Sequence, residues 1–139
     1  MEPLAKSASA PLIVLADDSE DSREMYREYF AFVGFDVETA ATGREILEKV
    51  RCHPPDIVVL DLSMPGLDGW TVCRVLKADQ ATKAIPIIVL TAHALDDSEA
   101  SAKAAGADHY LRKPCLPEVL VGAVRFALSR QANEAVRTA

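Results

Sequence analysis

Several features that would place a chain in a specialised class are missing from this sequence. Cysteine occurs only three times, scattered and without a C-x-x-C pair, so no disulfide framework is expected. No apolar run approaches the roughly 20 residues of a membrane span, and the first residues lack the apolar core of a signal peptide. These absences predict a protein with reduced thiols that resides in the cytoplasm and does not enter the membrane.

An excess of basic charge is also missing. The chain has 15 lysines and arginines against 21 aspartates and glutamates, which gives a formal net charge of −6 and a pI near 5.0. Domains that bind nucleic acid directly usually present a basic face to the phosphate backbone. We therefore expect no direct nucleic-acid partner.

The remaining composition is that of an ordinary globular domain. Of the 139 residues, 50% are apolar and 26% are charged. This length suits one domain with its own core and is short for two. We expect the domain to span residues 11–130, with flexible termini at 1–10 and 131–139, which are polar or rich in alanine.

Short apolar segments recur at regular intervals and predict five strands. They cover residues 12–16, 36–40, 56–61, 85–92 and 109–113.

Segments with helical spacing separate these strands. In the first of them, the apolar residues expected on one side of a helix are Met25, Tyr29, Phe30 and Val33. Gly34 and Gly106 each follow a predicted helix, as is typical of helix ends. A helix thus follows each strand, which gives five β-α units.

Strands that are apolar on both faces and alternate with helices indicate a parallel sheet covered on two sides. The expected fold is a doubly wound, flavodoxin-like α/β domain with five strands and five helices. Segments 12–16, 56–61 and 85–92 are the most apolar and should be central, whereas 36–40 and 109–113 are more polar and suit the edges. The strand order 2-1-3-4-5 satisfies this with right-handed crossovers.

Polar residues stand at the ends of four predicted strands. The first strand ends in Asp17 and Asp18, the third in Asp61, the fourth in Thr91 and the fifth in Lys113. In doubly wound folds, the loops after the carboxyl ends of the strands surround the ligand crevice. We therefore expect these side chains to gather at one rim of the sheet.

The chemistry of this set points to phosphate and a metal ion. Three neighbouring carboxylates repel one another unless a cation joins them, and oxygen ligands without nearby histidine or cysteine suit Mg²⁺. The ammonium of Lys113 suits a phosphoryl oxygen. With that charge neutralised, Asp61 can act as a nucleophile and form an acyl phosphate.

Together these motifs resemble the receiver domain of response regulators, the phosphoacceptor family of two-component phosphorelays. The similarity extends from about residue 11 to 130. It rests on the pair Asp17-Asp18, the segment DLSMPGLDG that begins at Asp61, the segment LTA that ends at Ala92, and GADHYLRKP, which ends at Pro114. Each motif alone is weak, but their joint occurrence at strand ends, in this order, is very specific.

The resemblance implies a role for each matched residue. Asp61 would accept a phosphoryl group from the phosphohistidine of a sensor histidine kinase or a phosphotransfer protein. Asp18, Asp61 and the backbone carbonyl of Ser63 would bind Mg²⁺, while Asp17 would act through water. Lys113 would contact the transferred group.

The resemblance also implies a conformational switch. The Thr91 hydroxyl would move onto the phosphoryl group and Tyr110 would turn inward behind it, which biases a pre-existing equilibrium. The Lys113-Pro114 bond is expected to be cis. The output face would comprise the helix over 97–107, the strand over 109–113 and the helix that follows. This face would bind a downstream effector protein, and the chain would be a monomer or a dimer that forms on phosphorylation.

Two other functions share part of this pattern. A phosphatase of the haloacid-dehalogenase type also uses a strand-end aspartate and Mg²⁺, but it usually has a second acid two residues later, where this chain has Ser63. A pseudo-receiver is an interaction module that works without phosphorylation, and it typically lacks an aspartate, threonine or lysine that is present here. The expected function is a signalling module rather than an enzyme, one that assists only its own phosphorylation and dephosphorylation.

Overall fold

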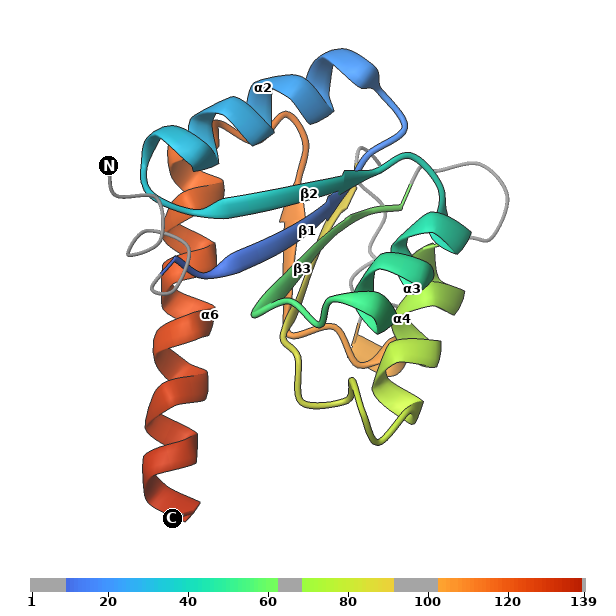
Figure 1. Ribbon diagram of the computed structural model, residues 1–139, viewed down its shortest axis with the longest axis vertical. Helices are drawn as coiled ribbons and strands as arrows, with labels where there is room; N and C mark the ends of the chain where they lie inside the picture. The colour runs from blue at the N-terminus through green and yellow to red at the C-terminus, as the bar shows by residue number, and fades with distance from the viewer. Residues whose placement is uncertain (1–9, 63–68, 92–102, 139) are drawn as a thin grey trace.

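One five-stranded sheet organises the chain. The structure is a computed structural model that describes residues 10–62, 69–91 and 103–138, with side chains described up to residue 133. The strands are β1 (Leu12–Ala16), β2 (Asp36–Ala40), β3 (Ile57–Asp61), β4 (Ile87–Thr91) and β5 (His109–Arg112). All neighbouring strands run parallel, in the order β2-β1-β3-β4-β5 (Figure 1). The predicted fold class and strand order are confirmed.

Burial separates the central strands from the edge strands. Every residue of β3 and β4 is buried, whereas every residue of β5 and all but the last of β2 are at least partly exposed. The more polar strands therefore lie at the edges, as their sequences predict. The central position of β3 places its last residue, Asp61, in the middle of one end of the sheet.

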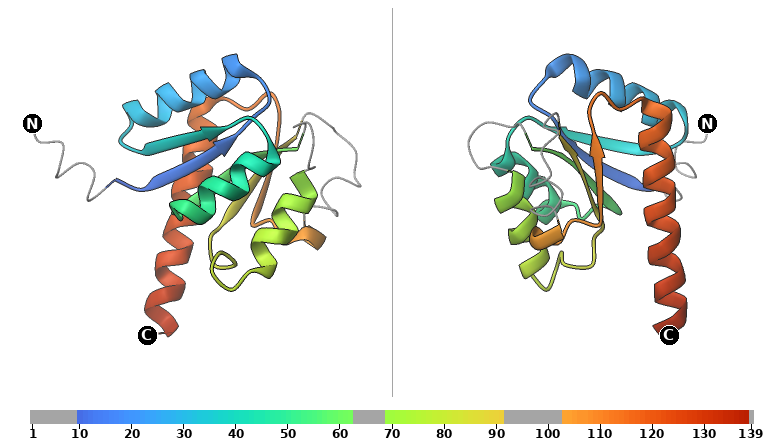
Figure 2. Two further views of the ribbon diagram at one scale, coloured as in Figure 1. Left: turned by 45° about the vertical axis from the view of Figure 1, so that its right-hand side comes forward. Right: turned by 180° about the vertical axis from the view of Figure 1, so that it is seen from behind.

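Helices cover both faces of the sheet. Helices α2 (Glu20–Phe32) and α6 (Pro117–Thr138) pack on one face, while α3 (Gly43–Cys52) and α4 (Gly69–Ala78) pack on the other (Figure 1 and Figure 2). The side chains of successive strand residues point to opposite faces of the sheet, and so alternate between a core under α2 and α6 and a core under α3 and α4. Residues 103–105 are also helical, within the segment 97–107 for which a helix is predicted. The part of that segment before residue 103 lies outside the described residues.

The buried side of α2 differs from the predicted stripe. Tyr26 and Phe30 are only 3% and 1% exposed, whereas Met25 is 44% exposed. Tyr29 and Val33 pack against the same core and are partly buried. The prediction is therefore wrong for Met25. Neighbouring residues are rotated by about 100° around a helix, and the pair Tyr26 and Phe30, four residues apart, takes the side that faces the sheet.

Local signals fix where α2 begins and ends. The Ser19 side chain caps the first turn by accepting a hydrogen bond from the Ser22 N–H at 3.3 Å. After the helix, Gly34 has a φ of 107°, in the left-handed region that favours glycine. Because Ser19, the residue after Asp18, is the cap, α2 begins at Glu20 and the acidic pair stays at the end of β1.

Helix α6 is longer than predicted. It continues to Thr138, into the segment 131–139 for which we expect a flexible terminus. The segment contains no glycine or proline and is rich in good helix formers. In addition, the Gln131 side chain donates a hydrogen bond to the Ala84 carbonyl at 2.8 Å, just before β4. No helix within the described ranges is both long enough and apolar enough to cross a membrane.

Candidate functional site

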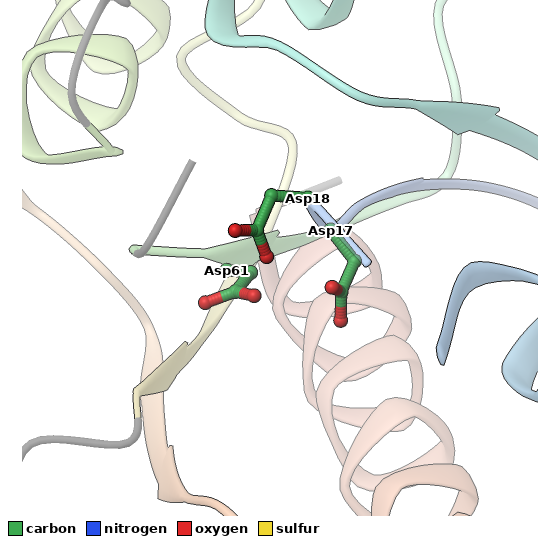
Figure 3. A group of neighbouring side chains, drawn as sticks. All are labelled: Asp17, Asp18 and Asp61. Atoms are coloured by element: carbon green, nitrogen blue, oxygen red, sulfur yellow. The ribbon is translucent and has the colours of Figure 1, made fainter. Parts of the chain in front are cut away.

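Three carboxylates meet where β1 and β3 end. Asp17 and Asp18 follow β1, Asp61 is the last residue of β3, and one carboxylate oxygen from each lies within 4.8 Å of the others (Figure 3). Asp61 and Asp17 are 0% and 1% exposed, while Asp18 is exposed to solvent. The topology thus gathers the acidic residues in the way the sequence predicts, with one of the three open to an incoming ion.

Lys113 closes the site from the other side. It follows β5, and its Nζ donates hydrogen bonds to Asp61 Oδ2 at 2.8 Å and to Asp17 Oδ2 at 3.2 Å. The backbone N–H of Lys113 donates to the Thr91 carbonyl at 2.7 Å, which fixes its position beside the end of β4. One ammonium therefore bridges two buried carboxylates from different strands.

Burial and charge shift the titration of these groups. Burial raises the pKa of Asp17 above its usual value, and the nearby Asp61 charge adds to this, although hydrogen bonds from Ser19 and Lys113 act in the opposite direction. Burial by itself would lower the pKa of Lys113, but its bonds to Asp61 and the charges of both carboxylates raise it overall. Lys113 therefore remains a cation at neutral pH.

The turn that holds the acidic pair is fixed by four hydrogen bonds to Asp17. Its N–H donates to the Ala40 carbonyl at 3.1 Å, and its Oδ1 accepts from the Ser19 N–H at 2.8 Å. Its carbonyl accepts from Arg23 Nη1 at 2.7 Å, and the fourth bond is the one from Lys113. The backbone that leads to the Asp18 carboxylate is thus held on several sides.

The donor set fits a hard divalent cation. Three carboxylates against the Lys113 ammonium and the Arg23 guanidinium leave a formal charge of one negative at the site. All three acidic groups offer oxygen, which Mg²⁺ prefers, and the exposed Asp18 leaves room for the waters that this ion retains. Ser63, whose backbone carbonyl is predicted to complete the ligand set, lies outside the described residues.

The two predicted switch residues stand on adjacent strands. Thr91 ends β4 and is fully buried. Tyr110 lies in β5, partly buried against the core beneath α3 and α4. Its hydroxyl is buried and has no hydrogen-bond partner within the part of the chain that the structure describes. The Lys113-Pro114 peptide is cis, as predicted.

Two residues near the site are absent from the sequence prediction. Arg23 and Tyr26, three residues apart on α2, donate hydrogen bonds to two backbone carbonyls near the site, those of Asp17 and Cys115. The helical spacing could have placed both on one side of α2. Their acceptors, however, are backbone carbonyls, which every residue has, so the sequence could not indicate these two hydrogen bonds.

Sequence comparison decides the family. A sequence model described as "Response regulator receiver domain" matches residues 13–125, most of the chain. The chain belongs to the response regulator receiver family. The receiver domain predicted from the strand-end motifs is thereby confirmed, as is its membership of two-component signalling systems.

Two curated relatives give the degree of similarity. The receiver domain is 42% identical over 118 residues to response regulator MprA of Mycolicibacterium vanbaalenii, covering 85% of this chain and 50% of that protein. It is 38% identical over 122 residues to DNA-binding response regulator MtrA of Mycobacterium tuberculosis, covering 88% and 52%. The chain therefore spans about half the length of the curated relatives it matches.

Solved receiver structures match nearly from end to end. A putative response regulator from Chloroflexus aurantiacus has a TM-score of 0.83 at 32% identity, covering 87% of this receiver domain and 99% of that chain. Chemotaxis response regulator CheY4 of Vibrio cholerae has a TM-score of 0.81 at 30% identity, covering 86% and 99%. These structures share the fold of this chain.

Proposed function

We propose that this receiver domain accepts a phosphoryl group on Asp61 from the phosphohistidine of a sensor histidine kinase or a phosphotransfer protein. The observation that carries the proposal is the bridge from the Lys113 ammonium to Asp61 at 2.8 Å and Asp17 at 3.2 Å. It holds a buried nucleophile and a cation together at a rim with surplus negative charge. Phosphoryl transfer depends mainly on such positioning and charge neutralisation.

The transfer forms one bond and breaks one. An Asp61 carboxylate oxygen attacks phosphorus, the P–N bond to the donor histidine breaks, and the histidine departs with the bond's electron pair. Lys113, freed from its bond to the Asp61 carboxylate, is then within reach of a phosphoryl oxygen on that residue.

Mg²⁺ is the cofactor that this donor set suits. Asp18 and Asp61 would hold it directly together with the Ser63 carbonyl, and Asp17 would act through water. A bound Mg²⁺ would neutralise charge on the phosphoryl oxygens. The surplus of carboxylates over ammonium groups and the exposure of Asp18 support this assignment.

Phosphorylation then acts through Thr91 and Tyr110. The Thr91 hydroxyl would turn onto the phosphoryl group, and Tyr110 would follow it inward. The Tyr110 hydroxyl supports this role. It is buried and, among the described residues, has no hydrogen-bond partner, and a buried hydroxyl in that state gains from a second position. The face formed by residues 97–107, β5 and α6 would bind a downstream effector protein. The chain would act as a monomer or as a dimer that forms on phosphorylation.

The direct partners are expected to be proteins. MtrA is by name a DNA-binding regulator, but this chain spans about half of that protein. Its net charge of −6 disfavours direct contact with nucleic acid. The chain would be a signalling module that assists only its own phosphorylation and dephosphorylation, because Ser63 stands where a phosphatase of the haloacid-dehalogenase type has its second acid.

The test uses a small phosphodonor and an intact mass. Incubated with Mg²⁺ and acetyl phosphate, the chain should gain the mass of one phosphoryl group, with acetate leaving. Asp61→Asn should gain none. Asp36→Asn, the same change at the opposite end of the sheet, should gain it as the unmodified chain does. If neither acetyl phosphate nor a histidine kinase in its phosphorylated form produces an adduct that depends on Asp61, the proposal fails.

A further inference from the structure

The Tyr26 side chain joins α2 to the loop that carries Lys113. Its hydroxyl donates a hydrogen bond to the Cys115 carbonyl at 2.7 Å, across 89 positions of sequence. Tyr26 is 3% exposed, so water does not compete for this bond. Burial raises the pKa of Tyr26, which keeps the hydroxyl protonated and able to donate.

The loop between β5 and α6 has few other attachments. Lys113 is anchored by its N–H to the Thr91 carbonyl, and α6 begins at Pro117. Pro114 has no N–H to donate. The Leu116 carbonyl accepts hydrogen bonds from the Val119 and Leu120 N–H groups of α6. Across the described residues, the Tyr26 hydroxyl makes the one hydrogen bond that ties residues 114–116 to an element other than α6. The backbone just after Lys113 therefore depends on Tyr26 for its polar contact.

Packing leaves the same loop partly open. Pro114 is exposed and Leu116 is 64% exposed. A groove of about 480 Å³ runs between α2 and this loop, with Ser22 and Met25 on one side and Pro114 and Leu116 on the other. Cys115 itself is buried in the same core as Tyr26, whereas its two neighbours Pro114 and Leu116 are exposed, so packing holds the loop at one residue and the Tyr26 hydroxyl adds a directed bond to that residue's carbonyl.

We propose that Tyr26 is a positioning residue, whose hydroxyl holds the 113–115 backbone so that the Lys113 ammonium stays between Asp17 and Asp61. Lysine has four rotatable side-chain bonds and loses considerable freedom when its ammonium is fixed. The position of the Lys113 ammonium is therefore fixed only if the Lys113 backbone is fixed. The inference rests on the proposed function for its catalytic consequence, but the placement of Lys113 can be measured without phosphorylation.

The test compares Tyr26→Phe with Tyr29→Phe. Both remove one hydroxyl from α2 and keep the ring. Within the described ranges, however, Tyr29 makes no hydrogen bond to the loop, and it packs half-buried against the core. The first measurement is the ¹⁵N signal of the Lys113 ammonium by NMR, in the absence of Mg²⁺ and phosphodonor. We expect this signal to shift and broaden in Tyr26→Phe and to stay unchanged in Tyr29→Phe.

The second measurement separates positioning from loss of fold. At saturating Mg²⁺ and well below the melting temperature, Tyr26→Phe should slow the acquisition of phosphate from acetyl phosphate by about three- to tenfold. Its Mg²⁺ affinity, measured by amide NMR titration, should stay within about twofold, because the backbones that carry Asp18 and Asp61 are held by β1, β3 and the turn at Asp17, to which the Tyr26 hydroxyl makes no bond. An unchanged Lys113 signal overturns the proposal. So does a loss of Mg²⁺ affinity equal to the loss of rate, which would indicate general loosening.

The two proposals fail in different ways. If the unsubstituted chain gains no phosphate on Asp61, the proposed function fails, and the Lys113 signal still decides the role of Tyr26. If the unsubstituted chain is phosphorylated and Tyr26→Phe matches it in signal and rate, only the positioning role fails.

Discussion

The Lys113 ammonium lies 2.8 Å from Oδ2 of Asp61, a fully buried carboxylate 52 residues away in the sequence. This ion pair joins β5 to β3 across the strand between them. The ammonium of the partly buried Lys113 compensates the fully buried Asp61 carboxylate, because an isolated charge at that depth would be costly. The same pair holds the nucleophile and the cation that the proposed transfer needs.

Replacing Lys113 with methionine should destabilise the fold and stop phosphorylation. Methionine keeps the apolar stem but leaves Asp17 and Asp61 without their ammonium, and removing one partner of a buried pair costs about 3–5 kcal/mol. Urea denaturation without Mg²⁺ should report this loss, and Mg²⁺ should restore part of it. Lys103→Met, at an exposed position, serves as the control. Equal stability of the two variants would contradict the structural role of the pair.

The buried Asp17 predicts a pH dependence of stability. Its pKa is raised in the folded state above the usual 3.8, so the folded chain binds the proton more tightly than the unfolded chain does. The stabilisation is therefore complete below the unfolded value and is lost as pH rises through the folded value. Asp17→Asn removes this contribution.

The measurement is a set of urea denaturations of both proteins, without Mg²⁺, from about pH 3.5 upward. The free energy of unfolding of the unsubstituted chain minus that of Asp17→Asn should fall with rising pH across this window. A difference that rises with pH would mean that Asp17 is stabilised as a carboxylate in the folded state.

Arg23→Met should weaken Mg²⁺ binding. The Arg23 guanidinium donates to the Asp17 carbonyl at 2.7 Å, next to the peptide that leads to Asp18. Loss of one charged hydrogen bond to this turn should reduce the affinity by about tenfold. The shift in melting temperature at rising Mg²⁺ concentration measures this. Arg27→Met removes an exposed arginine paired with Glu24 on the same helix and should leave the affinity unchanged.

The three cysteines should react with iodoacetamide at different rates. Cys52 is exposed, while Cys73 is fully buried and burial raises its pKa to about 11. Burial also raises the pKa of Cys115. Because the thiolate is the reactive form, Cys52 should be alkylated first and Cys73 only when the chain unfolds. Peptide mass mapping over time gives the order, and early modification of Cys73 would contradict the packing beneath α4.

Much of the architecture follows from local pattern. The continuous apolar segments at β3 and β4 predict buried central strands, and the polar β2 and β5 predict edges. Strand-end placement was enough to predict that Asp17, Asp18, Asp61 and Lys113 gather at one rim. Periodicity is less reliable at single positions. At Met25 it did not decide which of two neighbouring residues faces the sheet, and in α6 a run of good helix formers gave no signal for the residue at which the helix ends.

The sequence by itself determined the fold class, the strand order and which acidic residues and which lysine meet at the carboxyl ends of the strands. Hydrophobic periodicity and residue type are local, and parallel β-α topology converts them into position. Only the tertiary structure decided how those residues are held. The bonds from Tyr26 to the Cys115 carbonyl and from Arg23 to the Asp17 carbonyl end on backbone oxygens, which every residue carries. Such contacts leave no pattern in the sequence and arise only when α2 packs beside the ends of β1 and β5.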